Sequence, residues 1–282
     1  MSLGALPIAA VAAVELERVS VRRGALSVLE AVDLRLEPGD SWVIFGENGA
    51  GKSTLIQLVS GQLAPSAGAI WVAGMRAKPE LPARLFSTGI RLMTLLEQPG
   101  LAPGVSALEN VALPLRYHAS ALSLHPDQAT GLAREALAAL AVYPPDLHSL
   151  PDRLSFGLQR RVALARILAL RPRIVLLDDP LLGVDSESCQ VIERVLRSWV
   201  RDPNLSLLCT SGDRDLGARL GARSADLTSD GVSQRAVTPT RAQNHPARQL
   251  VSAADPGDAG MLHWYSGFRT PPWRSPSTSK DP

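Results

Sequence analysis

The sequence has few of the residues from which disulfide frameworks and zinc sites are built. It contains 2 cysteines in 282 residues, and aromatic residues make up 4% of the chain. Two cysteines cannot form a disulfide framework and do not make a zinc site. A reducing compartment is the simplest interpretation. Cys209 is then expected to be a small core residue, and Cys189 a helix residue without a redox role.

Long apolar runs and an excess of one charge are also missing. The longest uncharged apolar opening, residues 3–14, is too short for a bilayer core of about 30 Å and lacks the positive region of a signal peptide. The 29 basic and 27 acidic residues leave a net charge of +2, which offers no electrostatic argument for a nucleic-acid partner. We expect a cytoplasmic protein whose role at a membrane comes through a partner.

Short β-branched runs alternate with helical patterns from about residue 13 to residue 230. This alternation is typical of βα units and predicts an α/β fold with a mainly parallel sheet. The segment of about 102–170 is mostly helical, and Pro126 with Asp127 as a cap marks one helix start. The expected strands are 14–21, 34–36, 41–45, 174–177 and 205–209, and the clearest helices are 52–60 and 127–141.

The composition divides the chain into three parts. Residues 1–12 form an N-terminal extension, 13–231 the folded domain, and 232–282 a tail rich in Pro, Ser and Thr. Because the tail lacks sustained periodicity, we expect it to be flexible. Its aromatic residues leave open a segment that orders on a partner: Trp264, Tyr265, Phe268 and Trp273.

A phosphate-binding loop pattern lies between the expected strand 41–45 and the expected helix 52–60. Glycines let backbone N–H groups surround phosphate oxygens, Lys52 reaches the outer phosphates, and Ser53 is a candidate Mg²⁺ ligand. The alternative, a glycine turn with a chance lysine, does not require this strand and helix context. The predicted nucleotide-binding residues are Gly46, Glu47, Asn48, Gly49, Ala50, Gly51, Lys52, Ser53 and Thr54.

A second acidic strand end, at Asp178 and Asp179, follows the apolar run 174–177. In P-loop NTPases such a strand end lies beside the phosphate loop, where an acidic group holds the metal. Asp178 is therefore the predicted Mg²⁺ partner of Ser53. The alternative is a turn with two solvated acids.

Residues 154–161 open a further helix, with Ser155 as a good N-cap. Over about residues 14–231, the chain resembles the ATP-binding domain of the ABC transporter ATPases. The resemblance lies in the order of four motifs: the phosphate loop, the segment 154–161, the Asp178 strand and residues 183–185. This resemblance implies a P-loop NTPase of the ABC type, with a mainly parallel sheet, an antiparallel β segment and a helical subdomain. It also implies ATP and Mg²⁺ as ligands.

The family resemblance further implies a head-to-tail dimer. Each ATP would lie between one subunit's phosphate loop and the other's signature segment, 154–159, with Ser155, Gly157 and Gln159 as nucleotide-binding residues. The dimer would be a homodimer or a heterodimer, and separate transmembrane subunits would be its membrane partners. Residues 105–115 look like the coupling-side stretch of members that move lipids or lipoproteins.

Several family positions depart from the pattern. Phe156 replaces the first signature glycine, and Leu158 replaces the glutamine after the second. Asp179 stands where the family has a catalytic glutamate, and its shorter arm withdraws the carboxylate; a misplacement of about 1 Å can cost on the order of 10²-fold in rate. Ser211 stands at the expected position of the switch histidine. We predict Asp179 and Ser211 as catalytic residues.

The sequence leaves the counterparts of two further family residues undecided. Spacing from Asn110 places the family's loop glutamine at Glu97, whereas a shift of one residue restores Gln98; a solvated loop acid is the third interpretation. Both residues are candidates for the catalytic set. The adenine-stacking aromatic is missing near Arg22 and Arg23, where an arginine plane can stack on a base, although a solvated basic turn is favoured.

The leading hypothesis is therefore an ATP-hydrolysing subunit of a membrane transporter, with slow turnover. The rival is a regulatory or structural subunit that binds ATP and dimerises but scarcely hydrolyses it. A soluble ABC protein of translation or DNA repair is disfavoured, because the sequence has neither a second phosphate loop nor a long coiled-coil insert. The histidines show no metal-ligand spacing.

Overall fold

The computed structural model describes residues 11–125, 127–228 and 231–234, which lie in one structural unit. Most of the predicted N-terminal extension and nearly all of the predicted tail therefore lie outside the described residues. The described part combines two sheets and a group of helices, and the order of these elements along the chain follows the predicted βα alternation.

The larger sheet has six strands in the order β10-β9-β3-β8-β7-β6. Neighbouring strands from β9 through β3, β8 and β7 to β6 pair in parallel. The edge strand β10 pairs antiparallel with β9. Every residue of β7 is buried, as expected for a strand covered on both faces. The strands are β3 (Ser41–Phe45), β6 (Leu92–Leu95), β7 (Ile174–Asp178), β8 (Ser206–Ser211), β9 (Arg223–Thr228) and β10 (Gly231–Gln234).

The smaller sheet is antiparallel, in the order β2-β1-β4-β5. Its strands β1 and β2 carry register shifts, and Arg18 and Ala31 adopt positive φ values of 46° and 47°, as bulged strands do. Its inner face joins the parallel sheet in one apolar core. The strands are β1 (Val14–Arg23), β2 (Leu26–Leu36), β4 (Ala67–Val72) and β5 (Met75–Arg76).

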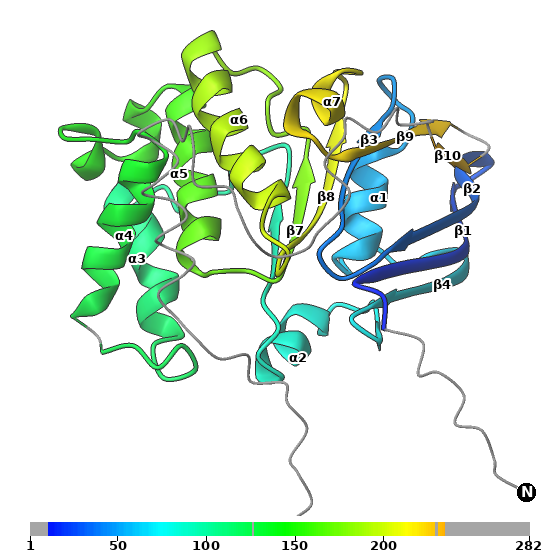
Figure 1. Cartoon of the computed structure of the whole chain (residues 1–282), viewed down its shortest axis with the longest axis horizontal. Coiled ribbons are helices and arrows are strands. Elements are labelled where there is room, and N and C mark those ends of the chain that lie inside the picture. Colours follow the sequence, from blue (N-terminus) through cyan, green and yellow to red (C-terminus); the bar gives the residue numbers. More distant parts are fainter. Residues whose placement is uncertain (1–10, 126, 229–230, 235–282) are drawn as a thin grey trace, which may run out of the picture. The chain divides into compact units, whose positions relative to one another are not determined.

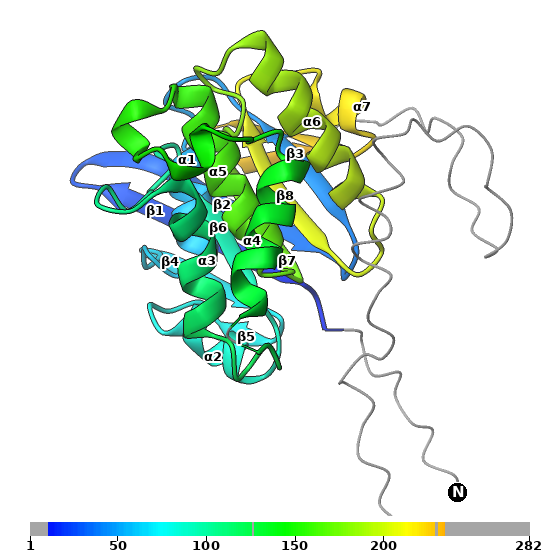
Figure 2. The same ribbon diagram turned by 90° about the vertical axis from the view of Figure 1, so that its left-hand side faces the viewer.

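The helices separate into two groups. Helix α1 contacts β7 and β8 of the larger sheet and β4 of the smaller one, whereas α3, α4 and α5 contact one another and gather on the left of Figure 1, away from the antiparallel sheet. Figure 2 shows the same three helices from the front. The helices are α1 (Lys52–Val59), α2 (Leu81–Ser87), α3 (Ala107–Tyr117), α4 (Gln128–Ala139), η1 (Asp146–His148), η2 (Pro151–Arg153), α5 (Phe156–Ala169), α6 (Ser186–Val200) and α7 (Leu216–Leu220).

The predicted α/β architecture, with a mainly parallel sheet, an antiparallel β segment and a helical subdomain, is confirmed, with differences at element boundaries. β2 begins at Leu26, well before the predicted strand 34–36, because it pairs with β1 along the whole hairpin. The predicted cap at Asp127 makes no side-chain hydrogen bond to α4; instead the Gln128 side chain accepts from the His125 N–H at 2.7 Å. The sheet also runs beyond residue 231, where the sequence analysis placed the end of the domain, since β10 continues to Gln234.

Candidate functional site

The carboxyl ends of the parallel strands form one edge of the larger sheet. β3 ends at Phe45, β7 at Asp178 and β8 at Ser211. β8 lies between the other two and pairs Ser211 with Phe45 and Thr210 with Asp178. The phosphate loop, the acidic pair and the residues after β8 therefore meet at this edge, which is where open α/β sheets bind their ligands.

The phosphate loop (residues 46–54) presents backbone N–H groups at the start of α1. Gly51, directly before α1, has a left-handed φ of 93°, and a Cβ there would lie 2.7 Å from Cδ2 of Leu29. Both conformation and space thus require glycine. α1 has no side-chain cap and no acidic residue in its first turn. Its N–H groups and the positive end of its dipole are available to a phosphate.

Lys52 is the cation of the phosphate loop, and its side chain is buried. Nζ donates to the carbonyl oxygens of Gly46 at 2.7 Å and Glu47 at 3.3 Å. Nζ also lies 3.8 Å from Oδ2 of Asp179. The structure thus brings the predicted phosphate-binding lysine and the predicted catalytic acid into one ion pair. Glu47, Asn48 and Gly49 are exposed at the tip of the loop.

Asp178 and Ser53 offer the oxygen atoms predicted to bind Mg²⁺. Asp178 is 2% exposed, and its Oδ1 accepts a hydrogen bond from Oγ1 of Thr210 at 2.9 Å. Within the described part of the chain, its Oδ2 and the Ser53 hydroxyl have no hydrogen-bond partner. Mg²⁺ takes hard oxygen ligands and is usually held by one or two protein groups together with substrate phosphates. These two residues fit such an ion.

Other metal arrangements are not found in the described ranges. Among residues 11–125, 127–228 and 231–234, no group of three or more His, Cys, Asp and Glu side chains is placed to hold a metal ion.

Asp179 follows β7 with a left-handed φ of 45°, a conformation that Asp tolerates better than most residues. Its Oδ2 accepts from the Gly212 N–H at 3.1 Å. Burial raises the pKa of Asp179, an effect opposed by the Lys52 charge and the Gly212 hydrogen bond. The carboxylate is therefore a better proton acceptor than an exposed aspartate, yet both Lys52 and Gly212 already engage it.

Ser211 and Gly212 have different surroundings, and sequence reasoning considered only Ser211. The Ser211 side chain is 1% exposed, and its Oγ accepts from the Asp213 N–H at 3.0 Å. A Cβ at Gly212 would lie 3.6 Å from Oδ2 of Asp179 and 3.9 Å from Nζ of Lys52, with ordinary clearance. Position 212 therefore points at the centre of the site. The signal that could have found it is its place at the open end of the last parallel strand.

The segment after β6 carries the two alternative loop residues, Glu97 and Gln98, and both are exposed. Asn110 in α3 stabilises the next part of this connection. Its Oδ1 accepts from the Ala102 N–H at 2.7 Å, and its Nδ2 donates to the carbonyl oxygens of Ala102, Val105 and Ser106, each at 3.1 Å. The charge of Glu97 acts on Arg160 of α5.

The signature segment (residues 154–159) turns most of its side chains toward its own subunit. Ser155 is exposed, and its Oγ accepts from the Leu158 N–H at 3.2 Å, which confirms it as the N-cap and leaves its own O–H to donate. A Cβ at Gly157 would lie 2.3 Å from Oδ2 of Asp185, so glycine here allows α5 to approach α6. Gln159 donates from Nε2 to the carbonyl oxygens of Pro151 at 2.9 Å and Leu154 at 3.1 Å.

The expected adenine side of the site lies at the β1–β2 hairpin. Arg22 and Arg23 are both exposed there. The Arg22 N–H donates to Oγ of Ser66 at 3.0 Å. This arrangement supports the solvated basic turn that the sequence favoured, and it leaves both guanidinium groups at the surface.

A hollow of about 430 Å³ borders the outer side of the phosphate loop. In it the Arg214 guanidinium lies 4.2 Å from the centre of the Phe45 ring. The ends of β3 and β9 and the tip of the phosphate loop form its wall. Its lining residues are Phe45, Glu47, Asn48, Ala50, Arg214, Asp226, Leu227 and Thr228.

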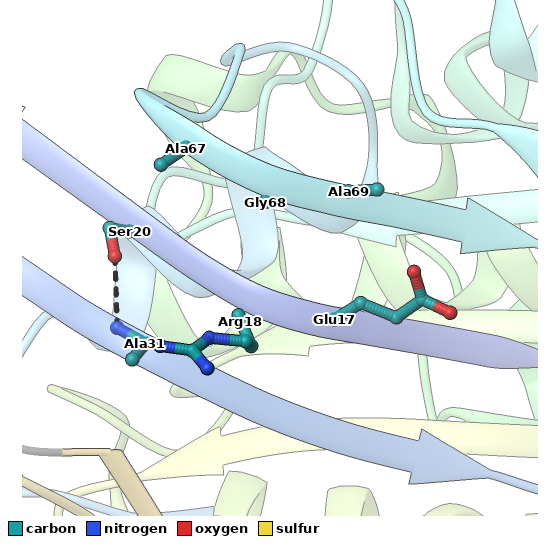
Figure 3. Close-up of a pocket in the computed structure, with 7 residues that line it drawn as sticks. All are labelled: Glu17, Arg18, Ser20, Ala31, Ala67, Gly68 and Ala69. Atoms are coloured by element: carbon teal, nitrogen blue, oxygen red, sulfur yellow. Dashed lines mark hydrogen bonds between the residues drawn. The ribbon is translucent and has the colours of Figure 1, made fainter.

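A second, open hollow of about 490 Å³ lies on the antiparallel sheet (Figure 3). The Ser20 Oγ accepts from the Ala31 N–H at 2.9 Å across its floor. Small side chains dominate it, and none of the predicted nucleotide-binding residues contributes. Its lining residues are Glu17, Arg18, Ser20, Ala31, Ala67, Gly68 and Ala69. We assign no function to it.

Helix α3 exposes two large apolar side chains. The helix begins within the predicted coupling-side stretch, residues 105–115, and ends just beyond it. Leu113 is 44% and Tyr117 85% exposed, and residues four apart lie on one helix face. At the end of the same helix, the His118 ring lies 4.1 Å from the Phe86 ring of α2. Among the described helices, none is both long and apolar enough to cross a membrane.

Comparison with known proteins gives one consistent result. Residues 29–182 match the family model of the ABC transporter. The chain is 31% identical over 185 residues to the intermembrane phospholipid transport system ATP-binding protein MlaF of Escherichia coli strain K12, a match that covers 65% of this chain and 66% of MlaF. It is 33% identical over 224 residues to the phosphonates import ATP-binding protein PhnC of Frankia casuarinae, covering 78% of this chain and 88% of PhnC.

Solved structures agree with the sequence matches. The fold superposes with a TM-score of 0.69 on the ATP-binding cassette MJ0796, determined as a dimer in a post-hydrolysis state with ADP and Pi. The identity to that chain is 27%, and the match covers 78% of the present chain and 96% of MJ0796. The present chain thus shares its fold with an ATP-binding cassette.

Proposed function

The chain belongs to the ABC transporter ATP-binding family, and on that premise we propose that it is the ATP-binding and ATP-hydrolysing subunit of a membrane transporter. One observation carries this proposal. The phosphate loop, Asp178 and Asp179 meet at one edge of the sheet, with Lys52 between the loop carbonyls and the acid.

The nucleotide phosphates bind to the phosphate loop. The N–H groups at the start of α1 donate to phosphate oxygens, and Lys52 pairs with the outer phosphates. Ser53 and Asp178 would hold Mg²⁺, which would supply positive charge to offset the negative charge of the phosphates. The exposed Ser155 of a second ATP-binding subunit, homologous or identical, donates its O–H to the same nucleotide from the opposite side.

In hydrolysis, water forms a bond to the γ-phosphorus while the bond from that phosphorus to the bridging oxygen of ADP breaks, giving ADP and phosphate. Asp179 orients the water and accepts its proton, a task helped by the pKa that burial raises. The short arm of Asp179 and the bonded hydroxyl of Ser211 leave the water weakly held. Turnover is therefore slow.

Closure of the dimer drives separate transmembrane subunits, which hold this subunit at the cytoplasmic face of the membrane. Leu113 and Tyr117 on α3 contribute apolar contacts to that partner, because exposed apolar side chains on one helix face favour docking. The phospholipid transport named for MlaF and the phosphonate import named for PhnC leave the cargo of the present chain undefined.

A second function is favoured by a specific observation. Asp179 is engaged by Lys52 at 3.8 Å and by Gly212 at 3.1 Å, so the acid has little freedom to hold a water. The alternative is a regulatory subunit that binds ATP and dimerises without measurable hydrolysis.

Single-turnover ATP decay on the purified protein separates the two functions. We expect slow hydrolysis by the wild type, loss of activity in Asp179→Asn, and a rise of about tenfold in Asp179→Glu, because the longer arm restores the reach of the carboxylate. Calorimetry serves as the control for folding and binding: all three should bind ATP, and Asp179→Asn, which removes the negative charge beside Lys52, should bind it at least as tightly as the wild type.

Wild-type decay equal to that of Asp179→Asn would favour the regulatory function. A fast wild type that Asp179→Glu slows would contradict the geometric argument and show a site rebuilt around the shorter acid.

A further inference from the structure

Arg160 in α5 is a fully buried arginine next to the hydrolytic residues, and the family resemblance assigns it no role. Its exposed fraction is 0%. Nη1 donates to the Leu96 carbonyl oxygen at 3.2 Å, and Nη2 to the Leu182 carbonyl oxygen at 3.4 Å. Within the described part of the chain, its Nε has no hydrogen-bond partner. One guanidinium thus joins two backbone segments that are far apart in sequence.

Both segments carry residues of the hydrolytic site. Leu96 directly precedes Glu97. Leu182 closes the turn that begins at Asp179, since its N–H donates to the Asp179 carbonyl oxygen at 3.1 Å. Movement of the guanidinium would therefore move the backbone on either side of the attacking water.

Phe156, in the signature segment, packs its ring against the same guanidinium. Its ring centre lies 5.0 Å from the guanidinium carbon of Arg160, a distance at which a cation and an aromatic face attract. A Cβ at Gly183 would lie 3.5 Å from Cε1 of the Phe156 ring. The residue that replaces a signature glycine therefore packs on Arg160 and on the turn after β7, within its own subunit.

The charge of Arg160 faces three carboxylates. Burial lowers the pKa of Arg160, and the charges of Asp179, Glu97 and Asp178 oppose that effect. An arginine remains protonated in proteins. In the register that aligns the family's neutral glutamine with position 97, the site holds an added acid, and the buried cation offsets this negative charge.

We propose that Arg160 is a positioning residue for ATP hydrolysis, which holds the Glu97 segment, the Asp179 turn and Phe156 together and compensates the charge of Glu97. The proposal rests on the proposed ATPase function. It predicts that the cation matters most when no Mg²⁺ shields the carboxylates from the nucleotide phosphates.

Arg166 provides the matched control within the same helix. It donates to the carbonyl oxygens of Gly100 at 2.9 Å and Pro99 at 3.1 Å, so it also joins α5 to the segment after β6. Burial is the cause that lowers the pKa of Arg166, whereas the charges of three carboxylates act on Arg160. Arg166 is half-buried, and a purely structural effect of removing an arginine that joins α5 to this segment should appear in both Arg160→Gln and Arg166→Gln.

The first experiment measures ATP affinity by calorimetry in Mg²⁺ and in EDTA, together with thermal unfolding. In EDTA, we expect Arg160→Gln to bind ATP about tenfold more weakly than the wild type does, because the phosphates then face uncompensated carboxylates. In Mg²⁺, the affinities of the variant and the wild type should differ by less than about threefold. Adding Glu97→Gln should restore the affinity in EDTA. Arg166→Gln should change neither affinity. This readout needs no hydrolysis, so it remains valid if the proposed ATPase function fails.

The second experiment measures single-turnover hydrolysis at saturating ATP. We expect Arg160→Gln to lower the rate by about 10- to 100-fold, the range for loss of charge-assisted hydrogen bonds, with Glu97→Gln recovering part of the loss. If Arg160→Gln fails to fold, Arg160→Lys keeps the charge but cannot bridge both carbonyls, and it should retain affinity in EDTA while hydrolysing slowly. Equal behaviour of Arg160→Gln and Arg166→Gln in both experiments would overturn the proposal.

Discussion

The nucleotide-holding half and the hydrolytic half of the site are built in different ways. The first half consists of the phosphate loop and Asp178, follows the family pattern throughout, and relies on backbone N–H groups at the start of α1. The second half consists of Asp179, the residues after β8 and the Glu97 segment, and departs from the pattern at several positions.

This difference shows that binding and turnover depend on different atoms. Backbone donors are held by the fold itself, so side-chain changes around them, other than loss of the Lys52 cation, leave phosphate binding in place. Hydrolysis depends on the reach of individual side chains, where a displacement of about 1 Å changes the rate strongly. The following substitutions test whether the two halves can be separated.

The largest effect is expected in the nucleotide-holding half, from Lys52→Ala. The substitution removes the cation that pairs with the outer phosphates and leaves Asp179 without its ion-pair partner. We expect ATP affinity to fall by about 100-fold or more, the scale of a lost charge-assisted contact plus an unpaired buried acid. Calorimetry with Lys78→Ala, an exposed lysine, provides the control. Equal affinity in wild type and Lys52→Ala would contradict the site assignment.

A histidine at either of two adjacent positions tests the hydrolytic half. In the Asp179→Glu background we expect Gly212→His to raise single-turnover hydrolysis by about tenfold, because a side chain there points at Asp179 and Lys52. Ser211→His should give less, since that side chain is buried and its hydroxyl bonds to Asp213. The effects of positions 179 and 212 should be non-additive because both act on one water. A larger gain from Ser211→His would restore the prediction made from sequence.

Gly157→Ala tests the contact between the two helices beside the signature segment. Its new Cβ would lie 2.3 Å from Oδ2 of Asp185 and 2.4 Å from Oγ of Ser188. We expect the free energy of unfolding to fall by about 1 to 3 kcal/mol, as for other overpacked sites. ATP affinity of the isolated subunit should not change, since the phosphate loop is remote from this contact. Unchanged thermal unfolding would show that α6 adjusts without cost.

The smallest effect is expected from ending the chain after Gln234, which keeps β10. We expect melting temperature and ATP affinity close to those of the full chain, because the removed residues lack the periodicity of a core element. Ending the chain at residue 230 should lower the melting temperature, since it also removes Val232, which packs against the core. A large loss on the shorter deletion would show that residues after 234 stabilise the domain.

Much of the fold was predictable because its signals are local. The buried run 41–45 and the glycines around Lys52 define the strand, loop and helix of the phosphate site, and the structure places β3 and α1 there. β10 was missed because a short edge strand carries little periodicity and is defined mainly by its pairing with β9. The full length of β2 was missed for a similar reason, since the bulges in the hairpin break its alternation.

The placement of the site residues was predictable only where a motif indicates it. Lys52, Ser53 and Asp178 stand in motifs, whereas Gly212 and Arg160 act through neighbours that are distant in sequence. A glycine reveals nothing about which atoms a side chain would meet at its position. An arginine in a helix pattern resembles any solvated residue until the fold buries it.

In the proposed ATPase, the ion pair between Lys52 and Asp179 would make ATP binding an exchange of partners. Before ATP arrives, the cation that will hold the phosphates neutralises the acid that will serve the water. The γ-phosphate must compete with Asp179 for Lys52, and its success releases the carboxylate at the moment when a substrate is present. ADP, which has no γ-phosphate, would compete less well with Asp179 for Lys52. The same ion pair would therefore allow the subunit to distinguish ATP from ADP.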